Sequence, residues 1–358
     1  MSPSTLVLRA FREPDSLVSL GLAEWDLLLR QVRHANLLAR LYTVLEERSL
    51  LQQVPSQPLE HLNWAYVVLD KHAQAVRWEV MQIRKALADV DIPIILLKGA
   101  AYALAKLPHA RGRIFSDIDI LVPKNRLNEV EAALMLNGWA VMDLDAYDQH
   151  YYRTWMHELP PMQHHKRMTV IDVHHAIMPQ TAHVRPDSEK LCAAASELPE
   201  YPGLKVLNPT DMVLHSAAHL LHDSELDHGL RDLVDIDSLL RQFCSLPNFW
   251  PNLVERAKEI ELTRTLFYAL RYAVYVLGTP VPAEAINAAR IGRPSRFTLF
   301  IMDPLFHRAL MPDHPSCSDW LTGIARWLLY IRANWLRMPP LLLARHLFHK
   351  AFISPRHK

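Results

Sequence analysis

The stretch RGRIFSDIDILV, residues 111–122, is the most informative part of the chain. Asp117 and Asp119 lie one residue apart in a run that otherwise has the apolar character of a buried strand. Side chains alternate between the two faces of a strand, so both carboxylates point to the same side. Two like charges on one face repel each other, and burying them without a partner is costly. The pair therefore indicates a divalent cation site, and oxygen ligands favour Mg²⁺ or Mn²⁺. The alternative is a strand end with two solvated acids.

The residues before this stretch indicate a phosphate-binding turn. Residues 92–97 are a continuous apolar run, typical of a strand buried on both faces, and residues 100–107 are strong helix formers. Between them, Lys98 supplies a positive charge and Gly99 permits a close approach to the backbone at a helix N-terminus. Arg113 is placed to hold a second phosphate oxygen. Without the Asp-x-Asp strand, Lys-Gly would indicate only an ordinary turn.

At these residues the chain resembles the nucleotidyltransferase superfamily, and most of all a bacterial family of uncharacterised nucleotidyltransferases. The shared elements are residues 97–100 (LKGA), Arg113, residues 116–122 (SDIDILV) and residues 172–174 (DVH). The resemblance implies metal ligands and catalytic groups at Asp117, Asp119 and Asp172. It implies that the nucleotide is bound by Lys98, Gly99, Ala100, Arg113 and Ser116. Ala100 departs from many relatives, because it lacks the hydroxyl that they direct at the triphosphate.

Asp172 is the candidate third carboxylate. A two-metal site holds the attacking and leaving oxygens about 4 Å apart, and a third acid activates the acceptor hydroxyl. Asp172 stands between two apolar residues in the strand-like run 168–174, where an acid needs a partner. We expect it to complete the metal site or to take the proton; the alternative is a strand-edge acid that caps a neighbouring loop. For His174 and His175, a structural role is at least as well supported as a catalytic one.

Composition narrows the class of protein. The chain has 358 residues, 50% of them hydrophobic and 22% charged, with a net charge of +1, which argues against a broad nucleic-acid surface. The three cysteines, Cys192, Cys244 and Cys317, lack metal-ligand spacing and indicate a reducing compartment. The N-terminus lacks the apolar core of a signal peptide, and no run of 18 apolar residues predicts a transmembrane helix. We expect a cytoplasmic protein.

The predicted fold class is α+β, with a small mixed-sheet nucleotidyltransferase core framed by N-terminal and C-terminal helices. We divide the chain into a helical region (1–90), a catalytic core (91–180), a second helical region (181–320) and a basic apolar tail (321–358). Apolar periodicity predicts a long helix over 59–90 and a helix over 125–137, ending at Gly138 before a strand over 139–144. Residues 145–167, rich in aromatic residues and histidine, are predicted to be a segment facing the acceptor or a surface hairpin.

Three histidines share one face of a helix predicted to begin near Pro209. His215, His219 and His222 are spaced at i, i+4 and i+7. We expect them to line a helix that covers the catalytic cleft, with Arg231 paired to a nearby acid. The alternative is a metal site of the kind found in HD phosphohydrolases, with Asp223 and a later aspartate as further ligands.

The tail, residues 321–358, contains seven lysines or arginines and no acid, interleaved with tryptophan and leucine. Such a segment is suited to peripheral contact with an anionic membrane, or to a nucleic acid or protein partner. The alternative is a packed terminal helix pair, divided at Pro339-Pro340.

The sequence thus predicts a Mg²⁺- or Mn²⁺-dependent enzyme that transfers an NMP from an NTP to an acceptor hydroxyl. The acceptor is left open among a small molecule or sugar, a protein and a tRNA. The alternative from a different class is a non-catalytic nucleotide-binding or regulatory module on the same fold.

Overall fold

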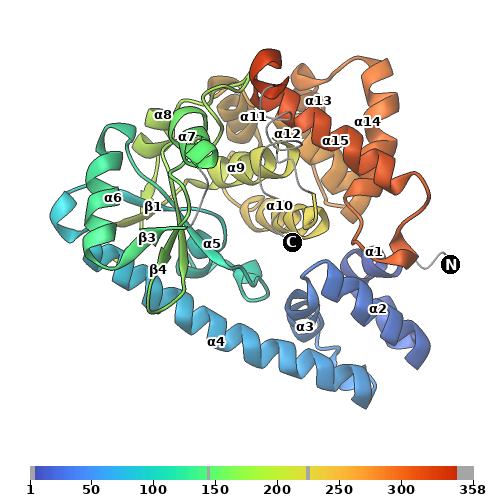
Figure 1. Ribbon diagram of the computed structural model, residues 1–358. Helices are drawn as coiled ribbons and strands as arrows, with labels where there is room; N and C mark the ends of the chain where they lie inside the picture. Colours follow the sequence, from blue (N-terminus) through green and yellow to red (C-terminus); the bar gives the residue numbers. More distant parts are fainter. Residues whose placement is uncertain (1–4, 143–145, 223–225, 345–358) are drawn as a thin grey trace.

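The computed structural model describes residues 5–142, 146–222 and 226–344, and its described part is built around one mixed sheet of seven strands (Figure 1). Helices precede the sheet in the chain and follow it, so the predicted α+β fold framed by helices is confirmed. The strands are β1 (Ile94–Leu96), β2 (Asp117–Leu121), β3 (Trp139–Val141), β4 (Met162–His164), β5 (Val170–His174), β6 (Ser196–Glu197) and β7 (Leu204–Val206).

The strand order is β3-β4-β5-β2-β1-β7-β6. β2 lies between the antiparallel β1 and the parallel β5. Because β2 and β5 are in register, Asp119 lies directly beside Asp172. β1 is buried at all three residues, which explains its continuous apolar sequence. The sequence does not predict β6 and β7, because two or three residues carry too little periodicity, yet β7 pairs with β1 and extends the sheet past residue 180.

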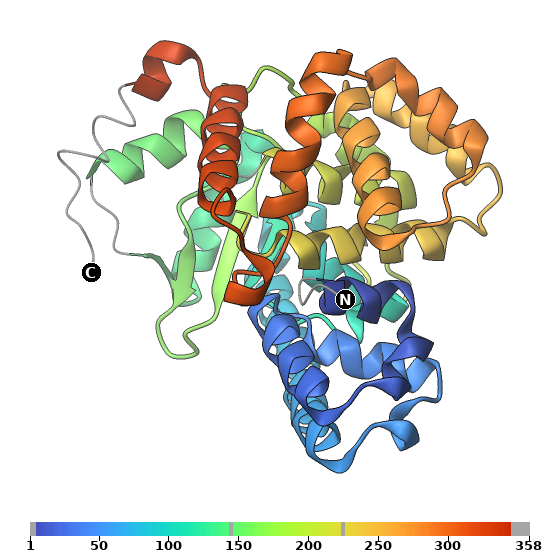
Figure 2. The ribbon, with the colours of Figure 1, turned by 90° about the vertical axis from the view of Figure 1, so that its right-hand side faces the viewer.

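The N-terminal helices gather on one side of the molecule, and α4 (Ser56–Ala86) leads from them to the sheet (Figures 1 and 2). At 31 residues, α4 is about 46 Å long. The predicted helix over 59–90 is therefore confirmed with an earlier end, since a 3₁₀ turn (Ala88–Val90) follows it. The other helices of this group are α1 (Thr5–Arg12), α2 (Leu22–His34) and α3 (Leu38–Glu47).

Two short helices pack against the sheet: α5 (Lys98–Leu104) contacts β1 and β2, and α6 (Leu127–Leu136) contacts β3. A further helix, α7 (Ala146–Trp155), lies between β3 and β4, so the prediction of a surface hairpin over 145–167 is wrong for this part. Its aromatic residues Tyr147, Tyr151 and Trp155 recur at four-residue spacing, which is helical. Tyr151 packs in a small cluster with Met338 and Leu343 of the C-terminal region.

The C-terminal helices form a second layer of structure beside the sheet (Figure 1). At its centre α9 (Pro209–His222) packs against α10, α11, α12 and α15. Ten of the fourteen residues of α9 are buried, as expected for a helix covered on most sides. The remaining helices are α8 (Ser188–Ala193), α10 (Gly229–Phe243), α11 (Phe249–Glu259), α12 (Thr263–Tyr272), a π-helical turn (Ala273–Leu277), α13 (Ala283–Ala289), α14 (Arg296–Ala309) and α15 (Thr322–Arg337).

α15 ends at Arg337, and another helical turn begins at Pro340, as the Pro339-Pro340 break predicts. The last part of the predicted tail, residues 345–358, lies outside the described residues. Within the described part of the chain, no helix combines the length and apolar character that a bilayer span requires.

Candidate functional site

The turn after β1 brings a lysine back onto the Asp-x-Asp strand. Lys98, the first residue of α5, has a left-handed backbone with φ of 43°. Its ammonium lies 3.0 Å from Oδ1 of Asp119. A left-handed conformation is unfavourable for a residue with a side chain, and such strained residues cluster at functional sites. The predicted Lys-Gly turn and the predicted Asp-x-Asp strand therefore meet in the structure.

Three carboxylates converge beside this lysine. Asp117 and Asp119 lie on β2 and Asp172 lies on β5, and one oxygen from each lies within 4.8 Å of the other two. Asp119 is only 4% exposed. The buried Oδ1 of Asp172 has no hydrogen-bond partner. Because a buried carboxylate oxygen without a partner is costly, this atom fits an additional ligand, and three carboxylates are the donor set that a hard divalent cation prefers.

The surroundings of Asp119 and Asp172 shift the pKa values of these two acids in opposite directions. Burial raises the pKa of Asp172 to about 8, and the charges of Asp119 and Glu158 act in the same direction. Burial alone would also raise the pKa of Asp119, but Lys98 and His174 outweigh it and hold that pKa below its usual range. Asp119 is therefore a permanent anion, whereas Asp172 keeps a proton near neutral pH unless another cation approaches.

His174 joins Asp119 to a fourth acid, Glu158. Its Nε2 lies 2.9 Å from Oδ1 of Asp119, and its Nδ1 lies 3.0 Å from Oε2 of Glu158. Burial lowers the pKa of His174, but Glu158 and Asp119 outweigh burial and raise it. A neutral imidazole has one N–H, so donating to both carboxylates requires the imidazolium form. The structure thus assigns His174 a definite place, as a cation that positions Asp119.

Two cavities meet at these residues. They have volumes of about 340 and 350 Å³ and share Lys98, Asp117, Asp119 and His219 in their walls. We call the first the acidic chamber; it is lined also by Tyr152, His157, Glu158, Asp172, His174, His222 and Arg337. We call the second the basic chamber; it is lined also by Asn36, Arg113, Ile114, Phe115, Ser116, His228 and Arg231. Asp117 and Asp119 therefore lie in the wall that the two chambers share, whereas Asp172 lines the acidic chamber alone.

A family of uncharacterised nucleotidyltransferases matches residues 22–278, well over half of the chain. The chain belongs to this family. The match begins in α2 and ends just after the π-helical turn, so the family region contains the whole sheet and α9 to α12, while α14 and α15 follow it. The resemblance drawn from the sequence motifs is thus confirmed. No curated protein and no solved structure gave a match.

Arg113, placed at the nucleotide by its motif, lies in the wall of the basic chamber and is held by α10. Its Nε lies 2.5 Å from Oδ2 of Asp235, and its guanidinium lies over the rings of Tyr102 and Phe115. Arg231 pairs with Asp232 at 2.8 Å, so the expected partner of Arg231 is confirmed as an acid. Asp235 and Asp232 of α10 therefore orient both arginines of this nucleotidyltransferase-family chain.

Gly99 and Ala100 are buried, and neither lines the basic chamber. A Cβ atom on Gly99 would lie 2.4 Å from the ring of Phe115. The close approach that requires glycine in this structure is therefore that of Phe115. Ser116 lies in the chamber wall, with its hydroxyl 3.4 Å from Oδ1 of Asp117.

The three histidines of α9 do not act as one group. His219 lies 3.5 Å from Asp232 and lines both chambers, whereas His222 contacts the hydroxyl of Thr265 at 3.0 Å. His215 is buried, and burial lowers its pKa well below the usual value. Within the described ranges, two groups of residues could hold a cation, and neither includes these histidines: Asp117, Asp119 and Asp172, and His157, Glu158 and His174. Asp223 lies outside those ranges. Because His219 and His222 line the acidic chamber, the expected helix over the cleft is present.

Sequence reasoning does not single out Glu158. It lies in a segment between α7 and β4 and reaches the site because it forms a β-bridge with His174. In the sequence, the one feature that marks it is the pair His157-Glu158, which stands one residue before Pro160-Pro161. Tyr152 and Arg337 also line the acidic chamber, and they come from α7 and α15, which are far apart in the sequence.

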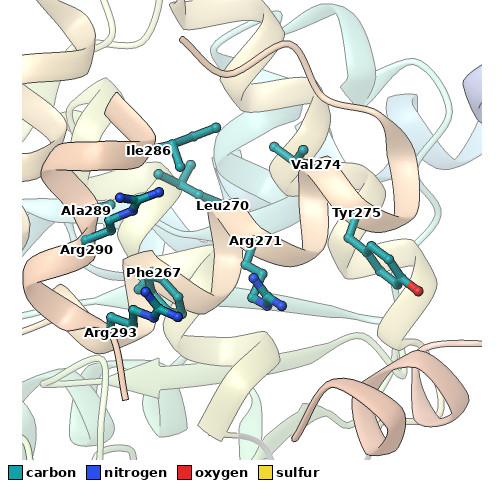
Figure 3. Close-up of a pocket in the computed structure, with 9 residues that line it drawn as sticks. All are labelled: Phe267, Leu270, Arg271, Val274, Tyr275, Ile286, Ala289, Arg290 and Arg293. Atoms are coloured by element: carbon teal, nitrogen blue, oxygen red, sulfur yellow. The ribbon is translucent and has the colours of Figure 1, made fainter. Parts of the chain in front are cut away.

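A separate cavity of about 340 Å³ lies along α12 and α13 (Figure 3). Its apolar side chains include Phe267, Leu270 and Ile286, and its arginines include Arg271, which is held by Asp303 at 2.6 Å. No acid or histidine lines it, and it shares no residue with the two chambers. Among the described residues, this cavity therefore presents none of the carboxylate or imidazole groups that commonly bind metal ions in proteins.

Proposed function

We propose that this member of the nucleotidyltransferase family transfers an NMP from an NTP to an acceptor hydroxyl. The observation that carries the proposal is the convergence of three carboxylates from two adjacent parallel strands, one of them with a buried oxygen that lacks a partner. Asp117, Asp119 and Asp172 would hold Mg²⁺ or Mn²⁺. Bound there, the cations would neutralise charge on the reacting phosphate and align the attacking and leaving oxygens.

The basic chamber suits the triphosphate. Lys98, Arg113 and Ser116, all assigned to nucleotide binding by the motif resemblance, line it together with Arg231. A cation at Asp119 would compete with Lys98 for Oδ1, and the ammonium would then be available to a phosphate oxygen at the edge of this chamber. Arg113 stays aligned by Asp235 and would contribute its remaining N–H groups.

The acidic chamber suits the acceptor. Asp172, Tyr152 and His157 line it. The acceptor oxygen would attack the α-phosphate and form a new P–O bond, while the bond to the β-phosphate breaks and pyrophosphate leaves. Asp172, whose own proton would be displaced when the cation binds, would take the proton of the attacking hydroxyl.

Label transfer tests this proposal directly. The protein would be incubated with a cell extract, Mg²⁺ or Mn²⁺, and each of the four NTPs labelled on either the α- or the γ-phosphate. We expect the α-label on a discrete acceptor and the γ-label in pyrophosphate. Asp117→Asn should remove the transfer. Asp26→Asn is the matched control, because Asp26 lies in an exposed ion pair with Arg30.

Transfer of the γ-label instead would show a kinase-like reaction and overturn the proposal. Metal-dependent NTP binding with no transfer in any extract would favour the alternative, a nucleotide-binding module on the same fold. Because the two labels leave in different products, the outcomes are distinguishable in one experiment.

A further inference from the structure

α15 carries apolar residues on two opposite faces. One face is buried through Ala325, Leu329 and Ala333, which recur at spacings of four residues. It packs mainly against α14, which lies side by side with it, and against α9 (Figures 1 and 2). The packing of this face agrees with one of the two alternatives predicted for the tail, a packed terminal helix.

The opposite face is a stripe of exposed apolar side chains, which we call the α15 stripe. Its residues recur at i, i+3, i+4, i+7 and i+11, and each is between 37% and 61% exposed: Ile324, Trp327, Leu328, Ile331 and Trp335. At 100° per residue these positions fall within one 100°-wide sector, away from the buried face. A surface helix normally presents polar residues there, and a contiguous exposed apolar patch marks an interaction surface.

Charge favours one occupant for this stripe. From Trp320 to the end, the chain contains seven lysines or arginines and no acid. Three of these seven have partners or places within the protein: Arg326 pairs with Asp313, Arg332 lies over the rings of Tyr268 and Phe306, and Arg337 lines the acidic chamber. The other four follow α15 in the sequence: Arg345, Lys350, Arg356 and Lys358. A positively charged segment that bears tryptophan has the composition of a surface that binds anionic lipid, because indole rings favour the bilayer interface and basic residues favour its anionic headgroups.

Shape and area also favour lipid over a second copy of the chain. The stripe lies on the outer face of α15. None of its residues lines the acidic chamber, the basic chamber or the cavity in Figure 3. Five side chains with full areas of about 150–250 Å² would expose on the order of 500 Å² at these fractions. Stable protein interfaces bury roughly 800 Å² on each partner, whereas a lipid surface needs no complementary groove.

We infer that the α15 stripe, together with the basic C-terminal segment, is an interfacial anchor for an anionic lipid bilayer. The helix would lie parallel to the membrane with Trp327 and Trp335 at the headgroup level. The same helix ends at Arg337, which lines the acidic chamber, so one element joins the docking surface to the candidate site.

Vesicle cosedimentation of the full-length chain tests the inference. Neutral phosphatidylcholine vesicles would be compared with vesicles that contain phosphatidylglycerol, at low and high salt. We expect binding to the anionic vesicles, weakening as salt rises, with a blue shift of tryptophan fluorescence. The double variant Trp327→Gln/Trp335→Gln should bind about tenfold or more weakly, because it loses the apolar part of the contact.

The matched control is Trp64→Gln/Val68→Gln, which alters an exposed apolar pair at the same kind of spacing on α4 and should bind as the wild type does. Neutralising Arg345, Lys350, Arg356 and Lys358 should remove much of the salt-dependent part. Failure of the full-length chain to bind anionic vesicles would overturn the inference, as would equal binding by the Trp327→Gln/Trp335→Gln variant.

Two other occupants would give distinct results, each of which overturns the inference. A second copy would appear as a dimer in sedimentation velocity that the Trp327→Gln/Trp335→Gln variant dissolves, with no vesicle binding. Coverage of the stripe by residues 345–358 of the same chain would appear as a lower unfolding temperature for this variant, again without vesicle binding.

Discussion

Asp119 and Asp172 are register partners on the parallel strands β2 and β5, and their carboxyl groups have pKa values displaced in opposite directions. The cause is the position of the available cations. Lys98 and His174 both contact Asp119, while Oδ1 of Asp172 has no hydrogen-bond partner. Lys98 and His174 therefore neutralise Asp119, whereas Oδ1 of Asp172 is left for a ligand. This difference determines how the site should respond to mutation, pH and metal.

The two aspartates should affect stability in opposite ways. Considered from like-charge repulsion alone, replacing Asp119 by Asn would leave stability unchanged or raise it. The contacts with Lys98 and His174 reverse that expectation, because Asp119→Asn leaves a buried cation without its partner at a cost of about 3–5 kcal/mol. Urea unfolding without metal, at pH 7, measures the change. Unaltered stability of Asp119→Asn would show that these contacts contribute little.

Asp172→Asn should stabilise the protein, and by an amount that depends on pH. The folded-state pKa of Asp172 is raised to about 8 from 3.8, so the wild type loses stability as pH rises from about 4 to about 8. The variant has no such loss, and its advantage should grow by at most about 1.4 kcal/mol for each pH unit in that window. Unfolding free energies of both proteins across pH 4–9 check this. A difference independent of pH would contradict the raised pKa.

Metal binding should release a proton from Asp172. Because this carboxyl group keeps its proton near neutral pH, a divalent cation must displace the proton before it can bind there. Affinity for Mn²⁺ should therefore rise by up to about tenfold per pH unit below pH 8 and level off above it. Calorimetry in two buffers of different ionisation enthalpy counts the protons released. Asp172→Asn should release none from this position, which separates it from the rest of the site.

Lys98 should matter for the nucleotide and not for the metal. Lys98→Met removes the ammonium that contacts Asp119, so NTP affinity in the presence of Mg²⁺ should fall, while affinity for Mg²⁺ alone should be unchanged or higher. Lys106→Met is the matched control, because Lys106 lies at the surface in an ion pair with Glu200. Calorimetry with metal alone and with metal plus NTP separates the two effects. Equal NTP affinity for Lys98→Met and wild type would remove Lys98 from the nucleotide site.

Gly99 should be intolerant of a methyl group because of Phe115. A Cβ atom there would lie 2.4 Å from the ring, so Gly99→Ala should destabilise the protein by about 1–3 kcal/mol. Adding Phe115→Ala should remove this penalty, and a double-mutant cycle measures the coupling. Gly323→Ala on α15 is the control: nothing lies within 4 Å of its added Cβ, and it should stabilise by about 0.4–1 kcal/mol. Additive effects of the Gly99 and Phe115 changes would show that the ring is not what requires glycine.

Much of the fold and of the site could be predicted from local patterns. Period two places Asp117 and Asp119 on one strand face, and the apolar run before Lys98 predicts a strand that is buried in the structure. The long helix over 59–90 follows from periodicity in the same way. α7 does not, because its aromatic residues suit a helix or a hairpin until their packing partners are known. Those partners include Met338 and Leu343, nearly 200 residues later in the chain.

Residue identity and short spacing are enough to indicate the nucleotidyltransferase family, the α+β class and the acidic residues of the candidate site. The tertiary structure, in contrast, places Asp172 beside Asp119, brings Glu158 to His174 and lets α10 hold Arg113. It also decided which apolar face of α15 is buried. Each depends on contacts between residues distant in the chain, and local propensity carries no information about which distant surfaces meet.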